Sequence, residues 1–570
     1  MNNNYYKPKN NKGKSSPNVV KKDFYNPYTF VSVSDSVFYL NEEEEKELKT
    51  IQDIPVEHSL SGSIEVNFKA LSPFCVRSDG GQSANMNGKY FVPGSSIKGM
   101  IRSVFEIMTY SNMRNGIANS RYSMRDLSND DYKLKSSDGP QKSGFLVLLN
   151  GNYYIQECKS EAKKYSEIAE LANKRPGTDE EQLKSAKKTR DKYGLLKSPF
   201  VKIGNETKMW FFSNFIDKKN HEFLFDIPNF DESQLIPLEE NEYNDFIFIH
   251  EKENTNESWK YWKSKLKNYS SIEEIRKDNH YGIVPCFFRK KANKFAVRDL
   301  GFSFLYRQPY PYTIHDFLPE EHKKGGIDLA QAVFGYVNGD NALKGRVQVG
   351  NAFIENAKPV SEQTFVMGSP KPTFFPFYIE QEEDSEKQLT YCSKNSTISG
   401  YKRFLVWDSA KTGDAEKTKV ASSFIPLSKG TQFTTKIYFH NLHDYELGAL
   451  LSAITFYQNE DCSHALGYAK PFGYGRLAVA GCKLNLANDS KITAGDLYKA
   501  FMTKMCERLG LAEDDWLGDM AYLFYIAQGN YDPQKEIRYP KMKNVKEGQK
   551  SNEFVAIKNQ KLNLVDFTPE

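Results

Sequence analysis

The first clear pattern along the chain is an alternation of apolar and polar side chains within residues 61–76. Ile64, Val66 and Phe68 alternate with polar residues, which is the period-two spacing of a β-strand with one buried face. A polar, glycine-rich loop follows, and then residues 95–109 change to helical spacing. We therefore predict a strand, a loop and an amphipathic helix in this order.

The predicted helix carries its apolar residues three and four positions apart along one side. They are Ile97, Met100, Ile101, Val104, Phe105 and Met108. Pro93 and Gly94 end the preceding strand, and Ser95 or Ser96 can cap the helix by accepting hydrogen bonds from its first N–H groups. This face should pack on a sheet.

The same two periods return in the second half of the chain. Residues 345–354, 433–441 and 475–486 have strand patterns, whereas residues 444–457 have helical spacing. The resulting order is strand, helix, strand, strand, helix, strand. We therefore predict an α+β protein with a ferredoxin-like core, the topology of RNA recognition modules, carrying large insertions.

Seven segments describe the predicted domain organisation. They are a disordered basic tail (1–22), the first part of the core (23–125), an inserted subdomain (126–300), a middle core segment (301–356), a second insertion (357–428), the last part of the core (429–490), and a helical extension with a polar tail (491–570). Within the first insertion, residues 144–156, 208–216, 221–227 and 244–251 are aromatic and predict strands. Residues 161–194 are charged and predict two exposed helices, broken near Pro176 and Gly177.

Composition changes this picture in a few respects. The 570 residues are 39% hydrophobic and 14% aromatic, with a net charge of +4, so binding to nucleic acid would need local basic patches. The 7 cysteines include no CxxC pair, which argues against zinc and against a disulfide framework. No segment has the length of an apolar membrane span, and the N-terminus lacks the apolar core of a signal peptide. We expect a cytoplasmic protein without a membrane partner.

Four segments resemble one known family. YFVPGSSIKGMIRSVFE (90–106) is similar to the helix-entry signature of the CRISPR-associated RAMP superfamily (repeat-associated mysterious proteins), and LGYAKPFGYGRL (466–477) is similar to its glycine-rich loop. FGYVNGDNALKGRVQVGNAF (334–353) and KGTQFTTKIYFHNLHDYELGALLSAI (429–454) resemble its middle segment and its last strand and helix. The resemblance implies a large, backbone-subunit-like RAMP of a type III effector in antiviral defence. Its expected partners are guide RNA, target RNA and other effector subunits.

The resemblance also implies RNA-binding residues. Residues 94–102 would bind the guide backbone at a helix N-terminus through Ser95, Ser96, Lys98 and Arg102, although Glu106 could simply pair with Arg102. In the glycine-rich loop the candidates are Lys470, Phe472, Gly473, Tyr474, Gly475 and Arg476. Arg346 in the middle segment is assigned to RNA on the same resemblance. Arg307 and Arg403 lie among aromatic residues, a pattern typical of base stacking. The alternative for the glycine-rich loop is an ordinary β-turn with packed aromatics, and for the two arginines it is surface arginines that cover aromatic packing.

Asp79 is the candidate catalytic residue, because RAMP backbone subunits place an aspartate between the first strand and this helix. A carboxylate there could hold Mg²⁺ for cleavage of target RNA. Alternatively, Asp79 forms an Asx turn before Gly80 and Gly81. Two further functions stay open: a metal-independent guide-processing endoribonuclease, with His58 as its candidate base, and a non-catalytic scaffold.

Overall fold

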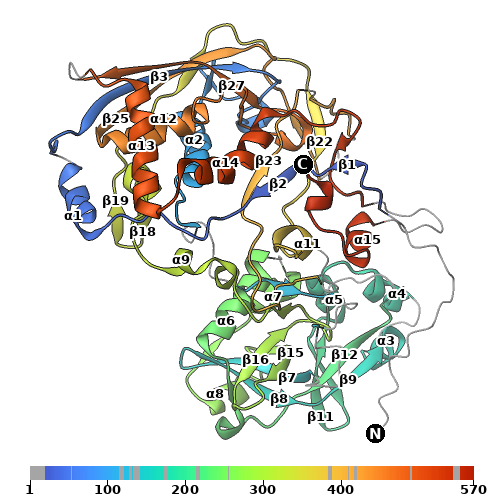
Figure 1. Ribbon diagram of the computed structural model, residues 1–570. Coiled ribbons are helices and arrows are strands. Elements are labelled where there is room, and N and C mark those ends of the chain that lie inside the picture. Colours follow the sequence, from blue (N-terminus) through green and yellow to red (C-terminus); the bar gives the residue numbers. More distant parts are fainter. Residues whose placement is uncertain are drawn as a thin grey trace. The chain divides into compact units, whose positions relative to one another are not determined.

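The computed structural model describes residues 20–569 except 53, 114–120, 127–130, 133–140, 173–177, 214–218, 254–255, 383–387, 409, 416–419, 488–490 and 543–551. Contacts divide the chain into two units: a large unit of Met1–Ile117 and Phe317–Glu570, and an inserted unit of Ala118–Asp316. The protein mixes helices and strands throughout, as expected for an α+β fold (Figure 1).

The large unit is built on a five-stranded sheet with the order β20-β25-β3-β27-β26. These strands are β20 (Val347–Val349), β25 (Gln432–Leu442), β3 (Leu60–Ala70), β27 (Arg476–Leu486) and β26 (His464–Ala465). All neighbouring pairs are antiparallel. Ile64, Val66 and Phe68 of the central strand are fully buried, as their alternation predicted. The intervening polar side chains therefore occupy the opposite face of the sheet.

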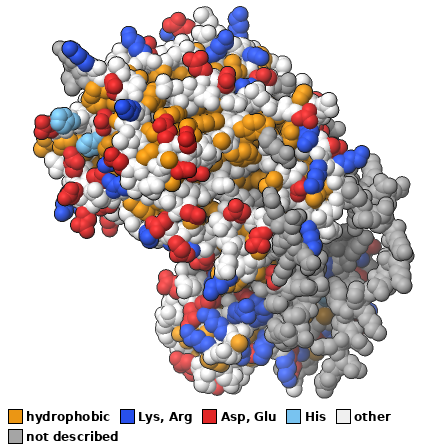
Figure 2. All heavy atoms as spheres, in the orientation of Figure 1, with side chains coloured by type: hydrophobic (Ala, Val, Ile, Leu, Met, Phe, Trp, Pro, Cys, Tyr) orange, Lys and Arg blue, Asp and Glu red, His pale blue; other side chains and the backbone are white. Residues whose placement is uncertain are grey.

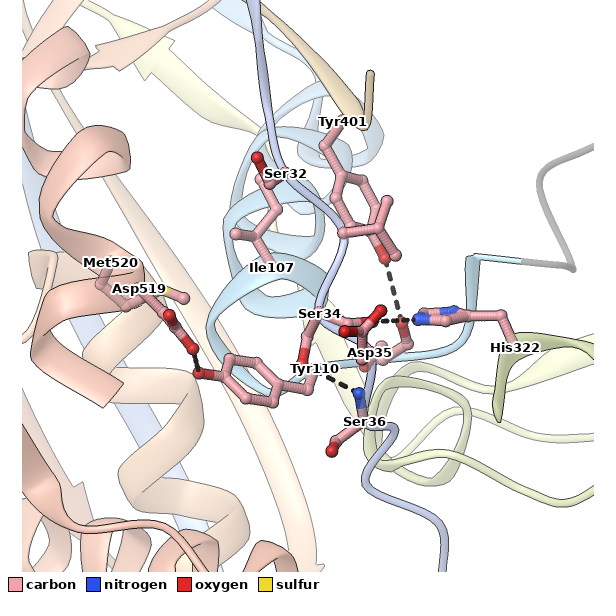
Figure 3. A pocket seen from close by; sticks show the side chains of 12 residues that line it. Ser32, Ser34, Asp35, Ser36, Ile107, Tyr110, His322, Tyr401, Asp519 and Met520 are labelled. Carbon is pink, nitrogen blue, oxygen red and sulfur yellow. Dashed lines mark hydrogen bonds between the residues drawn. The ribbon is translucent and has the colours of Figure 1, made fainter. Parts of the chain in front are cut away.

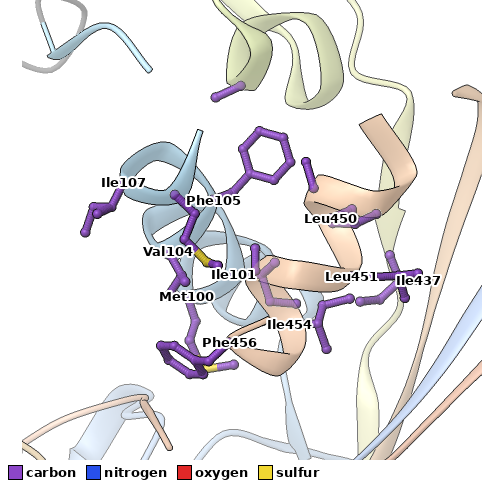
Figure 4. Close-up of a cluster of buried hydrophobic side chains, with 14 of the residues drawn as sticks. Met100, Ile101, Val104, Phe105, Ile107, Ile437, Leu450, Leu451, Ile454 and Phe456 are labelled. Carbon is purple, nitrogen blue, oxygen red and sulfur yellow. The ribbon is translucent and has the colours of Figure 1, made fainter. Parts of the chain in front are cut away.

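Helices α2 (Gly94–Met108) and α12 (Asp444–Thr455) pack against each other beside this sheet (Figure 4). The predicted apolar stripe of α2 is confirmed, because all six of its residues are at most 7% exposed. Ile101, Leu451 and Ile437 are among the side chains that fill the space between the helices and the sheet (Figure 4). Two further helices, α13 (Ala494–Leu509) and α14 (Glu513–Gln528), add to the same core.

The start of α2 differs from the prediction. Neither Ser95 nor Ser96 caps the helix; it begins at Gly94 after Pro93, without a side-chain cap from that residue. Instead, the Gly94 N–H donates to Asn351 Oδ1 at 2.8 Å. A Cβ on Gly94 would lie 2.1 Å from the Val349 carbonyl oxygen, so the close approach of the two chains requires glycine.

This approach also explains why the predicted strand 345–354 is interrupted. Only Val347–Val349 joins the main sheet, as β20. After Gly350 and Asn351 the chain enters β21 (Ala352–Ile354), which pairs with β5 (Lys89–Val92) in a separate three-stranded sheet. The break places the Asn351 side chain at the start of α2.

The remaining elements of the large unit surround this core. They are β1 (Phe24–Tyr25), β2 (Tyr28–Val31), α1 (Glu42–Ile51), β4 (Asn85–Met86), α9 (Glu320–Lys323), α10 (Leu329–Phe334), β18 (Tyr336–Asn338), β19 (Asn341–Leu343), β22 (Gln363–Val366), α11 (Phe375–Tyr378), β23 (Tyr401–Phe404), β24 (Ala421–Phe424), β28 (Glu536–Ile537) and α15 (Glu553–Asn559).

Both predicted tails are partly packed. Of the predicted tail 1–22, residues 1–19 lie outside the described part, but Val20 is 7% exposed and belongs to a hydrophobic cluster with Phe567. Lys22 and Asp566 form an ion pair in the same region. These ends are polar overall, but a few apolar residues within them pack into the hydrophobic cluster.

The inserted unit contains two sheets, ordered β10-β11-β12-β9 and β13-β8-β7-β15-β16, with β14 paired to β7. Its elements are β6 (Ser123–Met124), β7 (Lys142–Leu149), β8 (Asn152–Cys158), β9 (Ser160–Lys164), α3 (Tyr165–Leu171), α4 (Thr178–Ser185), α5 (Thr189–Leu196), β10 (Phe200–Ile203), β11 (Glu206–Phe211), β12 (His221–Asp226), β13 (Ile236–Pro237), α6 (Glu240–Ile247), α7 (Glu257–Lys263), β14 (Asn268–Tyr269), α8 (Ile272–Lys277), β15 (Val284–Lys290), β16 (Val297–Gly301) and β17 (Gln308–Pro309).

Three predictions for the inserted unit need correction. Residues 144–156 form a hairpin rather than one strand, because Asn150 and Gly151 both have positive φ and make its turn. Residues 244–251 lie in α6 and the helical turns after it, not in a strand. Residues 160–164 form strand β9 ahead of the charged helices, whereas the break proposed near Pro176 and Gly177 lies outside the described residues.

Candidate nucleic-acid interface

Arg346 is a structural residue, contrary to its assignment to RNA. Its side chain is 0% exposed. The guanidinium forms a bidentate ion pair with Glu446, with a distance of 2.8 Å between Nη1 and Oε2, and donates to the carbonyls of Asn441 and Ala332. These acceptors satisfy the group inside the core. Arg346 therefore ties the segment before β20 to the start of α12 and has no donor left for a phosphate.

The glycine-rich loop (466–475) is packed, not open. Tyr474 is 6% exposed and donates its hydroxyl to the Lys411 carbonyl at 2.9 Å. The ring of Phe472 stacks on Phe365, with centroids 4.1 Å apart. Both rings belong with Phe424 to one small hydrophobic cluster. The packed alternative for these aromatics fits this arrangement better than stacking on RNA bases.

The glycines of this loop permit close approach of protein backbone, not of phosphate. Gly473 and Gly475 both have φ of 84°. A Cβ on Gly475 would lie 1.9 Å from the Leu466 carbonyl oxygen, and a Cβ on Gly467 would lie 2.4 Å from that of Cys75. The loop is thus held against the segment that follows β3.

Arg476 also serves this packing. It is 8% exposed, forms an ion pair with Asp408, and donates to the Gln528 carbonyl at 2.7 Å and to Ser463 Oγ at 3.2 Å. These contacts occupy the guanidinium, so direct RNA contact by Arg476 does not fit the structure.

Lys98 and Arg102 on α2 have partners within the large unit. Lys98 Nζ donates to the Val347 carbonyl at 2.9 Å, and burial together with the nearby Arg102 charge lowers the pKa of Lys98. Arg102 pairs with Glu106 at 2.7 Å, as the i,i+4 spacing suggested. Ser95 is exposed and Ser96 is half-buried at the first turn of the same helix. These four residues therefore make at most a weakly charged surface.

Arg403 and Lys470 form the most distinctive cationic site. Arg403 lies on β23, and its Nη1 donates to Ser103 Oγ of α2 at 2.8 Å. Burial lowers the pKa of Arg403 to about 10. Lys470 begins the short turn of the glycine-rich loop, and burial and the Arg403 charge both lower its pKa. Each side chain still reaches solvent in part.

Neither cation has an acidic partner among the residues that the structure describes. Arg403 donates to a neutral hydroxyl, and Lys470 Nζ lies 5.6 Å from the centroid of the Phe404 ring. Two like charges that are partly removed from water and not neutralised are unfavourable. A bound anion would neutralise the two positive charges and would compensate for their partial removal from water. The site joins α2, β23 and the glycine-rich loop, three segments that are distant in sequence.

Arg307 belongs to the inserted unit. Its side chain is 40% exposed, and its Nη1 lies 3.8 Å from Glu253 Oε1. The nearby Glu253 carboxylate weakens the attraction of Arg307 for a phosphate. The exposed part of the side chain can still stack on a base or pair with an acidic group.

Asp79 is exposed at the start of a short turn, Asp79–Gly81, between β3 and α2. In this turn the Ser78 carbonyl accepts a hydrogen bond from the Gly81 N–H at 3.3 Å. Within the described part of the chain the Asp79 carboxylate makes no Asx-turn hydrogen bond. Nor do those residues contain a group of three or more His, Cys, Asp or Glu that could hold a metal. Asp79 alone is too small a ligand set for Mg²⁺.

The histidines show no catalytic arrangement around Asp79. His58 is 89% exposed, with its Nε2 3.6 Å from Glu57 Oε1, and has a positive φ of 67° just before β3. His464 is 0% exposed, and burial lowers its pKa to about 4. Its Nε2 lies 2.8 Å from the Ile454 carbonyl oxygen, which fits a neutral ring donating from that nitrogen.

A separate cavity of about 340 Å³ in the large unit is polar and does not suit RNA (Figure 3). It lies beside Tyr110, whose hydroxyl donates to Asp519, and His322, which is hydrogen-bonded to the Ser34 carbonyl. Among the described residues, its lining contains the carboxylates Asp35 and Asp519 and no lysine or arginine. Two negative charges would repel phosphate.

The surface charge is mixed. On the face drawn in Figure 2, acidic and basic side chains are interspersed over the large unit rather than gathered in one basic stripe. No described helix is long and apolar enough to cross a membrane. On this face an RNA site would depend on a few well-placed cations, since no continuous basic stripe is present there.

Comparison with protein families identifies one match: residues 67–272 match the RAMP superfamily model. The match covers 206 of the 570 residues, about a third of the chain. It includes most of β3, Asp79 and the whole of α2, and it continues through much of the inserted unit, for which the sequence patterns had suggested no relationship.

Solved structures that match this chain include two with weak similarity. One is titled "CRISPR RNA-guided surveillance complex, pre-nicking", at 11% identity over 81% of this chain and 89% of that chain, with a TM-score of 0.22. The other is Csc2 of Thermofilum pendens, at 13% identity over 36% of this chain and 51% of that chain, with a TM-score of 0.14. Both scores are too low to support an argument. No curated protein matches the chain.

Two residues at the candidate site were missed by the sequence reasoning. Asn351 binds the first N–H of α2, and Ser103 holds Arg403. Ser103 could have been found, because it lies in the segment that resembles the family and next to Arg102. Asn351 gave no local signal, since its role depends on a contact with a residue 257 positions away.

Proposed function

We propose that this protein is a member of the RAMP superfamily and an RNA-binding subunit of a CRISPR ribonucleoprotein, built on a ferredoxin-like core and holding guide RNA in the manner of a type III effector subunit. In chain order, the four long-range strands β3, β20, β25 and β27 are separated by α2 and α12 in the order βαββαβ. Their order in the sheet, β20-β25-β3-β27, supports this description.

The observation that carries the RNA-binding proposal is the Arg403–Lys470 pair. Both cations are partly desolvated, both have lowered pKa values, and neither faces a described carboxylate. An RNA phosphate placed between them would accept charge-assisted hydrogen bonds from both. Because such contacts go to the backbone, the bases stay free to pair with target RNA.

The test is binding of guide RNA by an Arg403→Gln/Lys470→Gln double variant. Each lost phosphate contact should reduce the slope of log K against log salt by about 0.7 for a single strand. We therefore expect the slope to fall by roughly 1.4 and RNA to be lost at physiological salt. Lys324→Gln, which removes a 61% exposed lysine paired with Glu321, is the matched control.

Two results would contradict this proposal. An unchanged slope in the double variant would remove the pair from the interface. Failure of the wild-type protein to retain any RNA on purification from a host that carries the repeat array would favour the scaffold function instead. New RNA ends generated by the isolated protein would favour guide processing, and His58→Ala would then be the first variant to assay.

Cleavage of target RNA at Asp79 is a second, separate hypothesis. It rests on the exposure of this carboxylate and its freedom from the turn around it. Because the described residues form no Mg²⁺ site by themselves, we assign no metal-dependent step to Asp79. In the assembled complex, Asp79→Asn should stop cleavage and leave RNA affinity unchanged. Normal cleavage by that variant would exclude the hypothesis.

A further inference from the structure

A second cationic site in the large unit lies beside the first and has a different form. It is a small cavity of about 60 Å³. Its lining residues are Tyr28, Gly368, Ser369, Pro370, Lys371, Lys402, Phe404, Tyr539 and Phe554. They come from the N-terminal strand β2, the loop after β22, strand β23 and the C-terminal segment. No sequence pattern pointed to this combination.

The two lysines of this cavity interact with aromatic rings. Lys402 Nζ lies 3.8 Å from the centroid of the Tyr28 ring and donates to the Tyr378 hydroxyl at 3.0 Å. Lys371 Nζ lies 3.8 Å from the centroid of the Phe554 ring and 3.1 Å from Met542 Sδ. None of these contacts neutralises a positive charge. The lining that the structure describes includes no Asp or Glu.

Lys371 is also partly desolvated, and this burial lowers its pKa. A lysine held in such surroundings without a counter-charge gains from an anion that enters the cavity. The cations therefore favour a negatively charged ligand, and the rings favour one with a flat or apolar portion.

The size of the cavity limits what can enter. A water molecule takes about 30 Å³ in the liquid, so the volume corresponds to roughly two waters. That space suits a phosphate group but not a nucleobase. The rings of Phe404, Tyr539 and Phe554 are half-buried at the same place, and their exposed parts are surfaces on which a base can stack.

We propose that this cavity binds one phosphate group of a nucleotide through Lys371 and Lys402, with the attached base stacked on the surrounding rings. The nucleotide can come from a bound RNA strand or from free nucleotide in solution. Phe404 connects the cavity with the first site, since its ring centroid lies 5.8 Å from Lys402 Nζ and 5.6 Å from Lys470 Nζ. Only the RNA source rests on the proposed function, because a mononucleotide requires no guide.

The experiment measures binding of inorganic phosphate, adenosine, adenosine 5′-monophosphate and a short oligoadenylate RNA to the full chain by calorimetry. Lys371→Gln and Lys402→Gln should each weaken the monophosphate roughly 10- to 100-fold, the value of a charge-assisted hydrogen bond. Phe554→Leu should weaken the monophosphate but not inorganic phosphate. Lys324→Gln should bind like the wild type, and circular dichroism should show that every variant is folded.

The ligands distinguish the two sources. If the lysine variants weaken binding of RNA and the monophosphate does not bind, the proposal holds with an RNA strand as the ligand. If the lysine variants weaken binding of the monophosphate, the proposal holds with free nucleotide as the ligand. Equal affinity for adenosine and its monophosphate, no binding of any phosphate ligand, or unchanged affinity in both lysine variants would overturn it. If the wild-type protein binds no RNA while the monophosphate still requires Lys371 and Lys402, the proposed function fails and this site stands.

Discussion

Two arginines near the same core show how differently one side chain can be used. Arg346 is enclosed with Glu446 and two carbonyl acceptors. Arg403 meets the Ser103 hydroxyl and has no described acid beside it. The first arginine is satisfied by the fold, so its contribution is stability. The second keeps a positive charge without a counter-charge among the described residues. This is the condition expected of a site that binds an anion.

The same contrast applies to the lysines. Lys98 donates to the Val347 carbonyl and links α2 to a sheet strand. Lys470 lies beside Arg403, and burial together with the Arg403 charge lowers the pKa of Lys470. Positive charge in a segment that resembles a family motif is therefore a poor guide to RNA contact. The presence or absence of internal partners discriminates better. The following predictions test that distinction.

The largest effect is expected at the satisfied pair. Arg346→Met should lower the free energy of unfolding by about 3–5 kcal/mol, because it leaves Glu446 charged and buried without a partner. Urea denaturation measures this loss. The matched Arg346→Met/Glu446→Met variant should recover much of it. If Arg346→Met were as stable as the wild type but failed to bind RNA, the contrast between the two arginines would be wrong.

A similarly large loss is expected in the glycine-rich loop. Gly475→Ala should cost about 3 kcal/mol, because it combines a φ of 84° with a Cβ placed 1.9 Å from the Leu466 carbonyl oxygen. Gly80→Ala is the control, since Gly80 has a φ of 71° but no atom within 4 Å of the added Cβ, and it should cost about 1 kcal/mol. Equal thermal stability of the two variants would show that the loop is not held by packing.

A pH effect is expected from His464. Folding depresses its pKa from 6.5 to about 4, so the unfolded chain binds a proton that the folded chain excludes. Its contribution to stability is therefore present above pH 6.5 and is lost as pH falls towards 4. His464→Phe should remove about 2 kcal/mol of the decrease in unfolding free energy between pH 7 and pH 5. An unchanged pH dependence in this variant would mean that His464 is charged in the folded state.

The smallest effect on stability is expected at the unsatisfied arginine. Arg403→Gln loses one hydrogen bond to Ser103 but also removes a desolvated charge, so unfolding free energy should stay within about 1 kcal/mol of the wild type. RNA affinity should nevertheless fall about tenfold, the value of one charged contact. Parallel denaturation and RNA titrations measure both quantities. A large loss of stability with intact RNA binding would make Arg403 equivalent to Arg346.

Local sequence patterns predicted the elements well where one period dominates. The apolar stripe of α2 and the alternation in β3 both survive intact, because each reflects burial of a single face. The hairpin turn at Asn150 and Gly151 was missed although this dipeptide is a strong turn signal. Residues 244–251 were predicted as a strand from their aromatic content, yet they are helical, since tertiary packing overrides weak strand preference.

The sequence by itself determined which segments form the sheet and which helix faces are buried, because periodicity records burial directly. Only the tertiary structure decided which cations are free. Arg346 and Glu446 are 100 positions apart, and Arg403 reaches Ser103 across 300 positions. Whether an arginine finds a carboxylate or a hydroxyl depends on how distant segments meet. No local window contains that information, and the partner decides whether a positive charge stabilises the fold or is available to a ligand.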